Sequence, residues 1–346
     1  MNDLYICYTY YHLLITTVKA LENNKRIDIL VSNELPDKER IIGKLETQSF
    51  IDKLCLIDET PYLDEYNKKN RIISQLTKRS ILESVFHKMT NMDVLIYENI
   101  YTYNDMNLAS SFLIINNKKY HLIEDALDFF SYFDDYYHVK PTSYSIFGFQ
   151  HFIKKILRLG TNPWGQNKYC IDIEVNDMGK IKIPKNRVIE VSRKELFDNL
   201  SKINKRLVYT LFAENTTIPS LNCKKTMILF TQPLFADRFV PSMDDQLFVF
   251  ESIIKKYIKD GFFVTIKPHP RDLADYSKLI QVYNCNYIEK NIPSEILNFD
   301  ENVSFDEIVS ITSTSINFVE RVKKRTFMGK VYIDRCLREK SRKNDR

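Results

Sequence analysis

The sequence predicts two α/β domains, each built on a parallel sheet. Three observations support this fold class. Short apolar runs rich in β-branched and aromatic residues alternate with amphipathic segments, first in the N-terminal part and again from Met227 onward. The length of 346 residues fits two domains of ordinary size. With 44% hydrophobic and 27% charged residues, the chain has enough apolar material for large cores and too mixed a charge for disorder.

The N-terminal part supplies five candidate strands in chain order. Each is a short apolar run bounded by polar residues, and the segment after the first strand has apolar residues at 14, 18 and 21, the spacing of a helix. The candidate strands are Leu4–Thr9, Ile27–Ser32, Lys53–Ile57, Val94–Glu98 and Tyr120–Ile123. Residues 127–222 show a weaker pattern, in which 186–213 predicts one strand and one helix.

The C-terminal part repeats the alternation. It predicts a strand at MILFTQ (227–232), a helix over 244–261, strands at 262–268, 286–289 and 307–312, and a last helix over 313–324. Ser242 is placed to cap the first of these helices, with Asp245 as its third residue, and Gly261 to end it. These elements predict domains at 1–213 and 226–334, a polar linker at 214–225 and a basic tail at 335–346.

Glycine scarcity excludes two nucleotide-binding motifs. Only seven glycines occur in the chain. No G-x-G is present, and although Gly160 and Gly165 have P-loop spacing, Gln166 and Asn167 follow where Lys and Ser/Thr are needed. A Rossmann fingerprint and a P-loop are therefore not expected, and any phosphate must be held by other groups.

The net charge, the cysteines and the length of the apolar runs restrict which partners and which cellular location we expect. The net charge of +5 is too small to indicate nucleic-acid binding. Six scattered cysteines, with no C-x-x-C, predict buried thiols in a reducing compartment, and no apolar run reaches the length of a membrane span. We expect a soluble, cytoplasmic protein. Its basic C-terminus is interpreted either as a solvated tail or as a contact with an anionic membrane surface.

One candidate site follows the strand at 262–268. Flanking prolines fix the turn that carries His269 at the carboxyl end of this strand, the edge where open α/β sheets bind ligands. Lys267, Pro270 and Arg271 complete a cluster suited to an anion. The run Thr312, Ser313, Thr314 and Ser315 follows another strand, and we expect it to begin a helix whose N-terminus binds phosphate.

Acidic residues supply candidate general bases. Glu124 and Asp125 follow the strand at 120–123, where Asp125 is interpreted equally well as a base or as a helix N-cap. Asp237 competes with them, whereas Asp244 and Asp245 are expected to begin a helix. No Asp-x-Asp and no His pair at i, i+4 occurs, so we expect no metal and no other cofactor.

Together these segments resemble the bacterial sialyltransferases, and most of all glycosyltransferase family 52 with its lipooligosaccharide and capsule enzymes. The matching segments follow one another in the expected order: YICYTYYH (5–12), the pair at 124–125, LFTQPL (229–234), KPHPRD (267–272) and the run at 312–315. The resemblance implies a GT-B fold, in which two Rossmann-like domains face a central cleft. It also implies metal-independent transfer of sialic acid from CMP-sialic acid to a glycan hydroxyl, with inversion.

The resemblance also assigns roles. His269 would contact the CMP phosphate and act as general acid, and Ser313, Thr314 and Ser315 would hold that phosphate, while a carboxylate would deprotonate the acceptor. Ala126 stands where the wider group has Gly after its acidic pair, and family 52 favours an acid just after the TQP segment. Asp125 and Asp237 therefore stay rivals. Tyr10, Tyr11 and Glu124 are expected on the acceptor side.

Several alternatives stay open. His-Pro and Ser/Thr groups would also suit a transferase that uses another CMP- or CDP-linked donor, of the Kdo or glycerophosphate type. A non-catalytic protein that binds a nucleotide or a glycan is the other alternative. The expected partners are a CMP-sugar donor and a glycan acceptor that could be lipid-linked, with no nucleic acid. A second copy of the chain, as a homodimer, is a further open partner.

Overall fold

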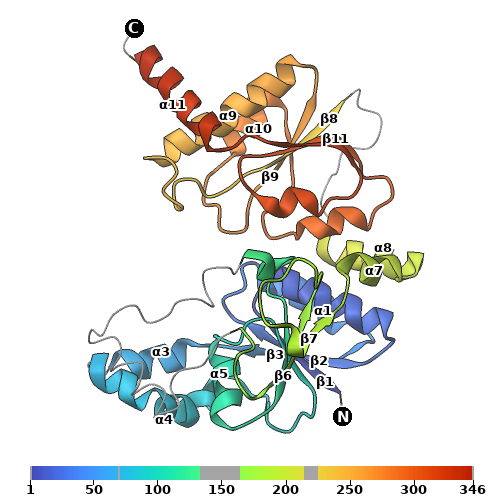
Figure 1. Cartoon of the computed structure of the whole chain (residues 1–346), viewed down its shortest axis with the longest axis vertical. Helices are drawn as coiled ribbons and strands as arrows, with labels where there is room; N and C mark the ends of the chain where they lie inside the picture. The colour runs from blue at the N-terminus through green and yellow to red at the C-terminus, as the bar shows by residue number, and fades with distance from the viewer. Residues whose placement is uncertain (1, 69–70, 133–163, 214–224, 345–346) are drawn as a thin grey trace. The chain divides into compact units, whose positions relative to one another are not determined.

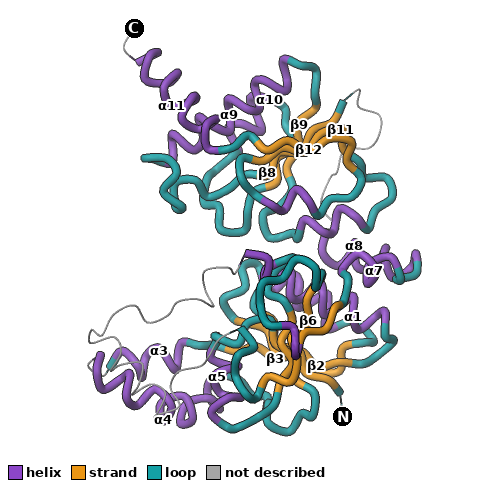
Figure 2. Tube along the Cα trace, viewed as in Figure 1, coloured by secondary structure: helices purple, strands orange, loops and turns teal. Residues whose placement is uncertain are grey.

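A computed structural model describes residues 2–68, 71–132, 164–213 and 225–344 of the chain (Figure 1). The chain divides into two compact units, 1–204 and 205–346, which we call the N-terminal and C-terminal domains. Each has its own parallel sheet (Figure 2). Of the expected linker at 214–225, all but Lys225 lies outside the described residues.

The N-terminal domain contains a seven-stranded sheet of order β3-β2-β1-β4-β5-β6-β7, in which every neighbouring pair is parallel. Its strands are β1 (Asp3–Cys7), β2 (Ile27–Ser32), β3 (Ile51–Ile57), β4 (Ile100–Thr102), β5 (Tyr120–Ile123), β6 (Cys170–Val175) and β7 (Val188–Glu190). Its helices are α1 (Tyr10–Glu22), α2 (Lys38–Glu46), α3 (Thr60–Asn67), α4 (Arg71–Met89), α5 (Leu108–Ile115) and α7 (Arg193–Asp198), and α8 (Lys202–Ala213) crosses into the next domain.

Helices cover both faces of this sheet, so β1 and β2 are buried along their whole length. Leu4 and Ile6 of β1 belong to one core with Leu82 of α4 and Leu113 of α5. Because side chains alternate along a strand, Cys7 lies on the other face, where its Sγ is 3.4 Å from Oγ1 of Thr16 in α1. The helix that follows β1 therefore packs opposite α4 and α5.

The C-terminal domain has a five-stranded parallel sheet of order β10-β9-β8-β11-β12. Its strands are β8 (Thr226–Phe230), β9 (Phe263–Lys267), β10 (Asn286–Tyr287), β11 (Phe305–Ser310) and β12 (Val322–Phe327), and its helices are α9 (Met243–Lys259), α10 (Ser277–Tyr283) and α11 (Lys330–Asn344). As predicted, Ser242 caps α9, accepting the N–H of Asp245 at 3.1 Å, and Gly261 follows its end in the left-handed conformation.

Both sheets have a switch point where the direction of winding reverses. In the N-terminal domain it lies between β1 and β4, because β2 and β3 follow β1 on one side and β4 to β7 extend the sheet on the other. In the C-terminal domain it lies between β8 and β11 for the same reason. Open α/β sheets bind ligands beyond the carboxyl ends of the strands at such points. The candidate site residues follow strands at or beside these two points.

The predicted strand Val94–Glu98 is wrong. The carboxylate of Asp93 accepts the N–H of Leu95 at 3.0 Å, so the chain turns here instead of extending. The strand begins later, as β4 at Ile100, and pairs with both β1 and β5. Within the weakly patterned part of the sequence the structure adds β6, and the single helix expected before 213 is divided into α7 and α8.

The predicted helix over 313–324 is also wrong. Only one 3-10 turn forms, at Thr314–Asn317, and the chain then extends into β12, which pairs with β11. The guanidinium of Arg325 donates to the carbonyl oxygens of Ile316 and Val319, which fixes the turn against the strand. β12 is an edge strand, and Lys323, Lys324 and Arg325 are exposed along it. The expected basic tail is instead mostly helical, since α11 continues to Asn344.

Candidate active site

His269 lies in the turn that follows β9, flanked by the buried Pro268 and the exposed Pro270. Its ring nitrogen Nδ1 accepts the backbone N–H of Arg271 at 3.1 Å. The proton of the neutral ring is therefore on Nε2, which is left as a donor. Burial, reinforced by the nearby charges of Arg271 and Lys267, lowers the pKa of His269. A neutral donor held in a turn between two prolines suits an anionic oxygen.

Lys267 does not join this cluster as an anion ligand. Its side chain is 4% exposed, and Nζ donates to the carbonyl oxygens of Pro268 at 2.9 Å and of Lys290 at 3.1 Å. Burial lowers the pKa of Lys267 to about 7, opposed by the charges of Glu295 and Glu289. The expectation that Lys267 holds phosphate is corrected, because the ammonium points into the domain and supports the turn from beneath.

Arg271 and Asp237 form an ion pair beside His269. Nη1 of the exposed Arg271 lies 3.2 Å from Oδ1 of Asp237, which belongs to the loop after β8. The loop itself is closed by the N–H of Asp237, which donates to the carbonyl oxygen of Pro233. The structure thus brings one of the two rival bases next to the candidate general acid.

Gln232 links the loops of β8 and β11 across the switch point. Its amide contacts Thr312 twice: Nε2 donates to Oγ1 at 2.8 Å, and Oε1 accepts the backbone N–H at 2.8 Å. This pair fixes the start of the Ser/Thr run. Only the resemblance to family 52 had pointed to the TQP segment. The Gln232–Thr312 contact joins residues that are distant in sequence, so no local sequence pattern could predict it.

The Ser/Thr run occupies the predicted edge without the predicted helix. The hydroxyl of Ser313 accepts the N–H of Ser315 at 3.3 Å, and the N–H of Ser313 donates to Oγ of Ser310 at 3.0 Å. Because the turn at Thr314–Asn317 is only four residues long, the argument from a helix dipole does not apply. The backbone N–H groups of Thr312, Ser313 and Ser315 already have acceptors, so hydroxyls are what this loop offers an anion.

These groups share the carboxyl edge of three adjacent strands. His269 follows β9, Gln232 follows β8 and Thr312 follows β11, and β8 lies between the other two. Neighbouring strands are about 4.8 Å apart, so the outer two loops are separated by about 10 Å. A phosphate group could meet donors from both sides of this edge.

Asp272 anchors the turn that carries His269, a role that was not predicted from the sequence. It is 2% exposed and accepts hydrogen bonds through both carboxylate oxygens. The donors are Oγ1 of Thr231 at 2.6 Å, Nε2 of Gln246 at 2.8 Å, the hydroxyl of Tyr276 at 2.8 Å and the N–H of Ala274 at 3.0 Å. These contacts tie the His-Pro turn to β8, α9 and the segment before α10.

We expect Asp272→Asn to destabilise the chain by about 2–4 kcal/mol, because the new amide NH₂ faces donors that lose their acceptor. Thermal unfolding of the full chain should show a Tm lower by about 5–15 °C. Asp275→Asn is the matched control, since the exposed Asp275 accepts one N–H, from Ser277, which Asn also accepts. Equal Tm values for the two variants would contradict the anchoring role of Asp272.

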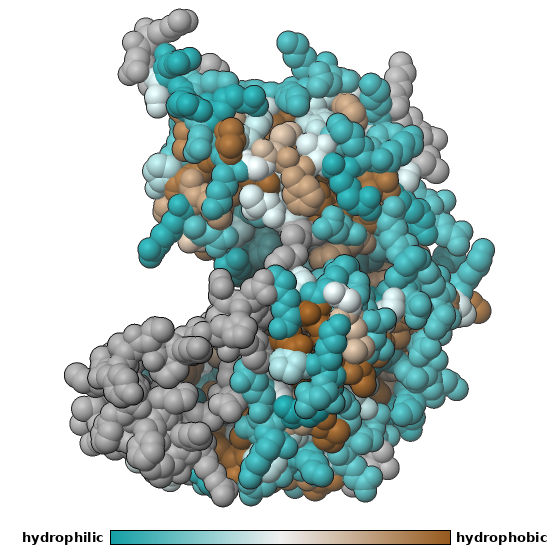
Figure 3. Space-filling view, viewed as in Figure 1, coloured by the Kyte–Doolittle hydropathy of each residue, from teal (hydrophilic) through white to brown (hydrophobic). Residues whose placement is uncertain are grey.

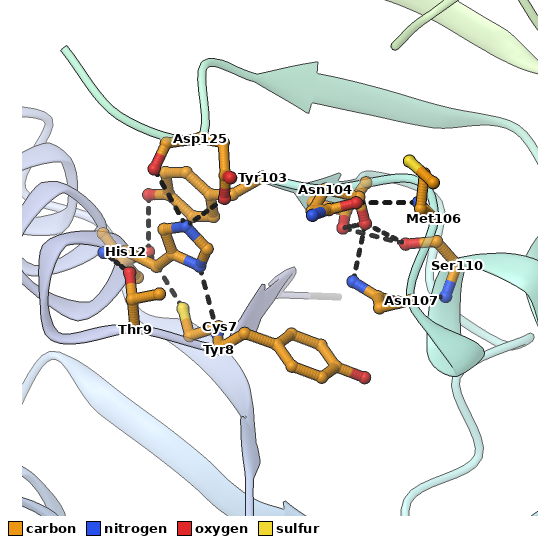
Figure 4. Close-up of polar contacts among 12 residues, drawn as sticks. Cys7, Tyr8, Thr9, His12, Tyr103, Asn104, Met106, Asn107, Ser110 and Asp125 are labelled. Carbon is orange, nitrogen blue, oxygen red and sulfur yellow. Dashed lines mark hydrogen bonds and ion pairs between the residues drawn. The ribbon is translucent and has the colours of Figure 1, made fainter. Parts of the chain in front are cut away.

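In the N-terminal domain, Asp125 pairs with His12 at the switch point (Figure 4). Nε2 of His12 lies 2.8 Å from Oδ1 of Asp125 and 3.2 Å from its carbonyl oxygen. Asp125 is 26% exposed and His12 only 1%. The next helical element that the structure describes is a 3-10 turn at Phe129–Tyr132, which does not begin directly after Asp125, so the N-cap interpretation of this residue is not met. His12 is within the YICYTYYH segment, but no role was predicted for it.

Glu124 is buried and supports the local fold. It is 1% exposed, and its two oxygens accept the backbone N–H groups of Phe130 at 3.2 Å and of Asn176 at 2.9 Å. Burial raises the pKa of Glu124 to about 7. The expected acceptor contact is therefore corrected: this carboxyl group faces inward and joins the loop after β5 to the end of β6.

The two tyrosines expected on the acceptor side also face inward. The hydroxyl of Tyr10, which is 6% exposed, lies 3.0 Å from the carbonyl oxygens of Pro36 and Asp37. The hydroxyl of Tyr11 is buried, and its side chain interacts with the buried Arg193. Tyr10 and Tyr11 therefore fix the start of α1 against its neighbours, a correction to the predicted role.

The loop after β4 also lies at the carboxyl edge of the sheet in the N-terminal domain. The carbonyl oxygen of Asn104 accepts from Nδ2 of Asn107 at 2.6 Å and from Oγ of Ser110 at 3.0 Å. Asn107 also caps α5 by accepting the N–H of Ser110. As Figure 4 shows, this network lies on the far side of Tyr103 from His12 and Asp125.

The described residues contain neither a metal-binding cluster nor a helix suited to span a membrane. No group of three or more His, Cys, Asp or Glu side chains is arranged to hold a metal ion within the described ranges. None of the helices that the structure describes is both long and apolar enough to cross a membrane.

Two Rossmann-like domains with parallel sheets define a protein of GT-B fold, as expected. Residues 60–328 match the sequence model of Glycosyltransferase family 52. The chain therefore belongs to glycosyltransferase family 52.

Two similar proteins extend this comparison. An uncharacterized protein of Haemophilus influenzae is 30% identical over 131 residues, which are 38% of this chain and 41% of that protein, so the match spans about two fifths of its length. The crystal structure of an α/β-galactoside α-2,3-sialyltransferase from the luminous marine bacterium Photobacterium phosphoreum aligns with a TM-score of 0.53. It is 12% identical, and the alignment covers 94% of this chain and 89% of that one. This similarity supports the fold.

Proposed function

We propose that the protein is an inverting, metal-independent sialyltransferase that moves sialic acid from CMP-sialic acid to a glycan hydroxyl. Membership of family 52 supports glycosyl transfer. The observation that carries the proposal is the neutral Nε2 donor of His269 on the same sheet edge as the Gln232–Thr312 pair. The Photobacterium neighbour, named as a sialyltransferase, agrees with the choice of sugar.

His269 has the properties that departure of CMP requires. The bond between the anomeric carbon and the phosphate oxygen breaks, and its electron pair goes to the phosphate of CMP. A positioned donor stabilises the charge that develops there. The anionic phosphate also raises the proton affinity of the imidazole. His269 can then take up a proton at Nδ1, which releases the N–H of Arg271, and act as general acid through Nε2. Ser313, Thr314, Ser315 and Arg271 are the further groups that we assign to the nucleotide.

Asp125 is the base that we favour over Asp237. In an inverting transfer the acceptor oxygen enters opposite the leaving group, so acid and base act on opposite sides of the anomeric carbon. Asp237 pairs with Arg271, two residues from His269, which puts it at the leaving-group end. Among the described residues, Asp125 pairs with the imidazole of His12 and with no lysine or arginine. It would accept the proton of the acceptor hydroxyl as the new glycosidic bond forms.

The acceptor class is a surface glycan of the capsule or lipooligosaccharide type, in free or lipid-linked form. We place the reaction in the cytoplasm, at the inner face of the membrane. The free cysteines, namely Cys7, Cys55, Cys170, Cys285 and Cys336, are consistent with a reducing compartment. Exposed basic residues on α11, such as Arg335 and Arg338, would support a peripheral contact with anionic lipid.

The test is incubation with CMP-sialic acid and a panel of galactosides, with products identified by mass spectrometry. We expect transfer, with a rate unchanged by EDTA. CMP-Kdo and CDP-glycerol in parallel reactions test the other donors. Transfer from one of these donors alone would replace the proposed sugar, loss of rate in EDTA would refute metal independence, and binding of CMP without any turnover would favour a non-catalytic protein.

A further inference from the structure

We infer that His12 is a positioning residue, which holds one oxygen of Asp125 so that the other meets the acceptor hydroxyl. This inference rests on the proposed transferase function and concerns its base. Both residues lie at the carboxyl edge of the sheet in the N-terminal domain. His12 is in the first turn of α1, which follows β1, and Asp125 is in the loop that follows β5. Between those strands lies β4, whose carboxyl end carries Tyr103.

The tautomer of His12 is fixed by the backbone. Its Nδ1 accepts the N–H of Tyr8 at 3.0 Å, an arrangement that a protonated Nδ1 could not make. The proton of the ring is therefore on Nε2 and is directed at Oδ1 of Asp125, 2.8 Å away. The N–H of His12 in turn donates to the side chain of Thr9, the N-cap of α1, at 3.2 Å.

The orientation of the ring is fixed as well. His12 stacks on Tyr103 with ring centroids 4.3 Å apart and an angle of 6° between the planes. Tyr103 is itself held, because its hydroxyl lies 2.9 Å from Oγ1 of Thr16 in α1. Figure 4 shows the imidazole enclosed between this ring, the carboxylate of Asp125 and the backbone after β1. The imidazole cannot turn without losing these contacts.

This arrangement leaves Asp125 one free oxygen. Within the part of the chain that the structure describes, Oδ2 makes no hydrogen bond, and the side chain is 26% exposed. A neutral donor orients the carboxylate without cancelling its charge, whereas a cationic partner would hold the negative charge and oppose proton uptake. Asp237 has such a cationic partner in Arg271. The geometry of His12 thus suits a base that must stay reactive.

A second His–carboxylate pair in the same domain provides a matched control. Nδ1 of His121 lies 2.9 Å from both oxygens of Asp172. This pair joins β5 to β6 within the strands, and not at their carboxyl edge. It resembles the His12–Asp125 pair chemically, but no role in transfer is assigned to it.

The experiment compares kcat and KM of His12→Phe, His12→Gln and His121→Phe in sialic acid transfer. Phe keeps the stacked ring but has no donor, while the amide of Gln can replace the Nε2 donor. We expect His12→Phe to lower kcat about 10–100-fold, because a misplaced catalytic group loses rates of this order, with KM for CMP-sialic acid within about twofold. We expect His12→Gln to recover most of the loss and His121→Phe to match the wild type.

If the inference is right, the loss of transfer rate in His12→Phe depends on the presence of the Asp125 carboxylate. When Asp125 is already Asn, His12→Phe should slow transfer by less than about twofold more. The inference is overturned if His12→Phe keeps the wild-type kcat, if His12→Gln is as slow as His12→Phe, or if the two losses multiply. A wild type that transfers no sialic acid overturns the proposed function, and this inference with it, before any variant is compared.

A measurement on the resting wild-type protein needs no enzymatic activity and uses a variant only to assign the signals. Nitrogen-15 NMR of the histidine side chains should show His12 with a protonated Nε2 and a bare Nδ1, assigned by the loss of its signals in His12→Gln. A protonated Nδ1 would overturn the inference even if transfer were slowed in His12→Phe, because the donor to Asp125 would then be absent.

Discussion

Replacing His269 by Ala is expected to lower kcat for sialic acid transfer about 10²–10⁴-fold, the range typical of a lost general acid. The variant removes the imidazole at the edge shared by β9, β8 and β11 and leaves the Gln232–Thr312 pair in place. Affinity for CMP should fall less than turnover does, since the hydroxyl donors of the Ser/Thr run and Arg271 remain. Single-turnover rates and CMP titrations on the same preparation separate the two effects.

The pH dependence of CMP binding gives a second readout on His269. Burial and neighbouring positive charge lower its pKa, so the free protein holds this residue neutral at pH 7. A bound phosphate raises the pKa of His269, so binding takes up a proton and affinity must rise as pH falls below neutral. The phosphate of CMP also titrates near pH 6. The part of the increase in CMP affinity at low pH that is lost in His269→Ala is therefore due to the imidazole.

His87→Ala is the control for these measurements, because His87 is exposed at the end of α4. It should match the wild type in rate and in pH dependence. Turnover that persists in His269→Ala within about threefold of the wild type would exclude His269 as the acid, since loss of an acid costs at least about 10²-fold.

Replacing Asp125 by Asn is expected to lower kcat about 10²–10⁴-fold, while Asp237→Asn acts mainly on donor binding. Asn keeps the size of the side chain and removes the group that accepts the proton. Asp237→Asn releases Arg271 from its ion pair, so we expect a changed KM for CMP-sialic acid with kcat within about tenfold. Steady-state kinetics with the donor and the acceptor varied in turn distinguish these patterns.

Asp172→Asn is the matched control for Asp125→Asn, because Asp172 also contacts a histidine in the same domain. It should leave kcat unchanged. If Asp237→Asn lost turnover and Asp125→Asn did not, the roles of the two acids would be exchanged and the assignment of His12 would fail with that of Asp125. If neither Asp125→Asn nor Asp237→Asn slowed transfer, neither of these two residues would be the base.

The sequence predicted the repeated α/β alternation because buried parallel strands and amphipathic helices have distinct periods. It located β1, β2, β5, β8 and β9 closely, and the cap of α9. It failed at Val94–Glu98, where one Asx turn from Asp93 outweighs an apolar run. It also failed over 313–324, because pairing with β11 makes a strand of residues whose local pattern favours a helix.

Site residues were predictable where they follow a strand. Strand ends place His269 and Asp125 at the ligand-binding edges of their sheets. Whether a polar side chain faces the edge or the interior depends on neighbours that are distant in sequence. Lys267 and Glu124 therefore looked like ligands but are buried, and Asp272 and His12 were overlooked. Partners such as the N–H of Tyr8 for His12 become visible only in three dimensions.

The exposed cations of β12 have a consequence for self-association. A second copy that added a strand to this edge would bring its own Lys323, Lys324 and Arg325 close to those of the first, if the same edge were used twice. Asp306 and Glu307 pair with Lys323 and Lys324 and offset part of this charge. Like charges on neighbouring strands still repel, and lysines on edge strands are a common protection against such joining. A homodimer built by continuing the C-terminal sheet from one chain into the next is therefore disfavoured. Low salt would oppose the joining of two β12 edges most strongly.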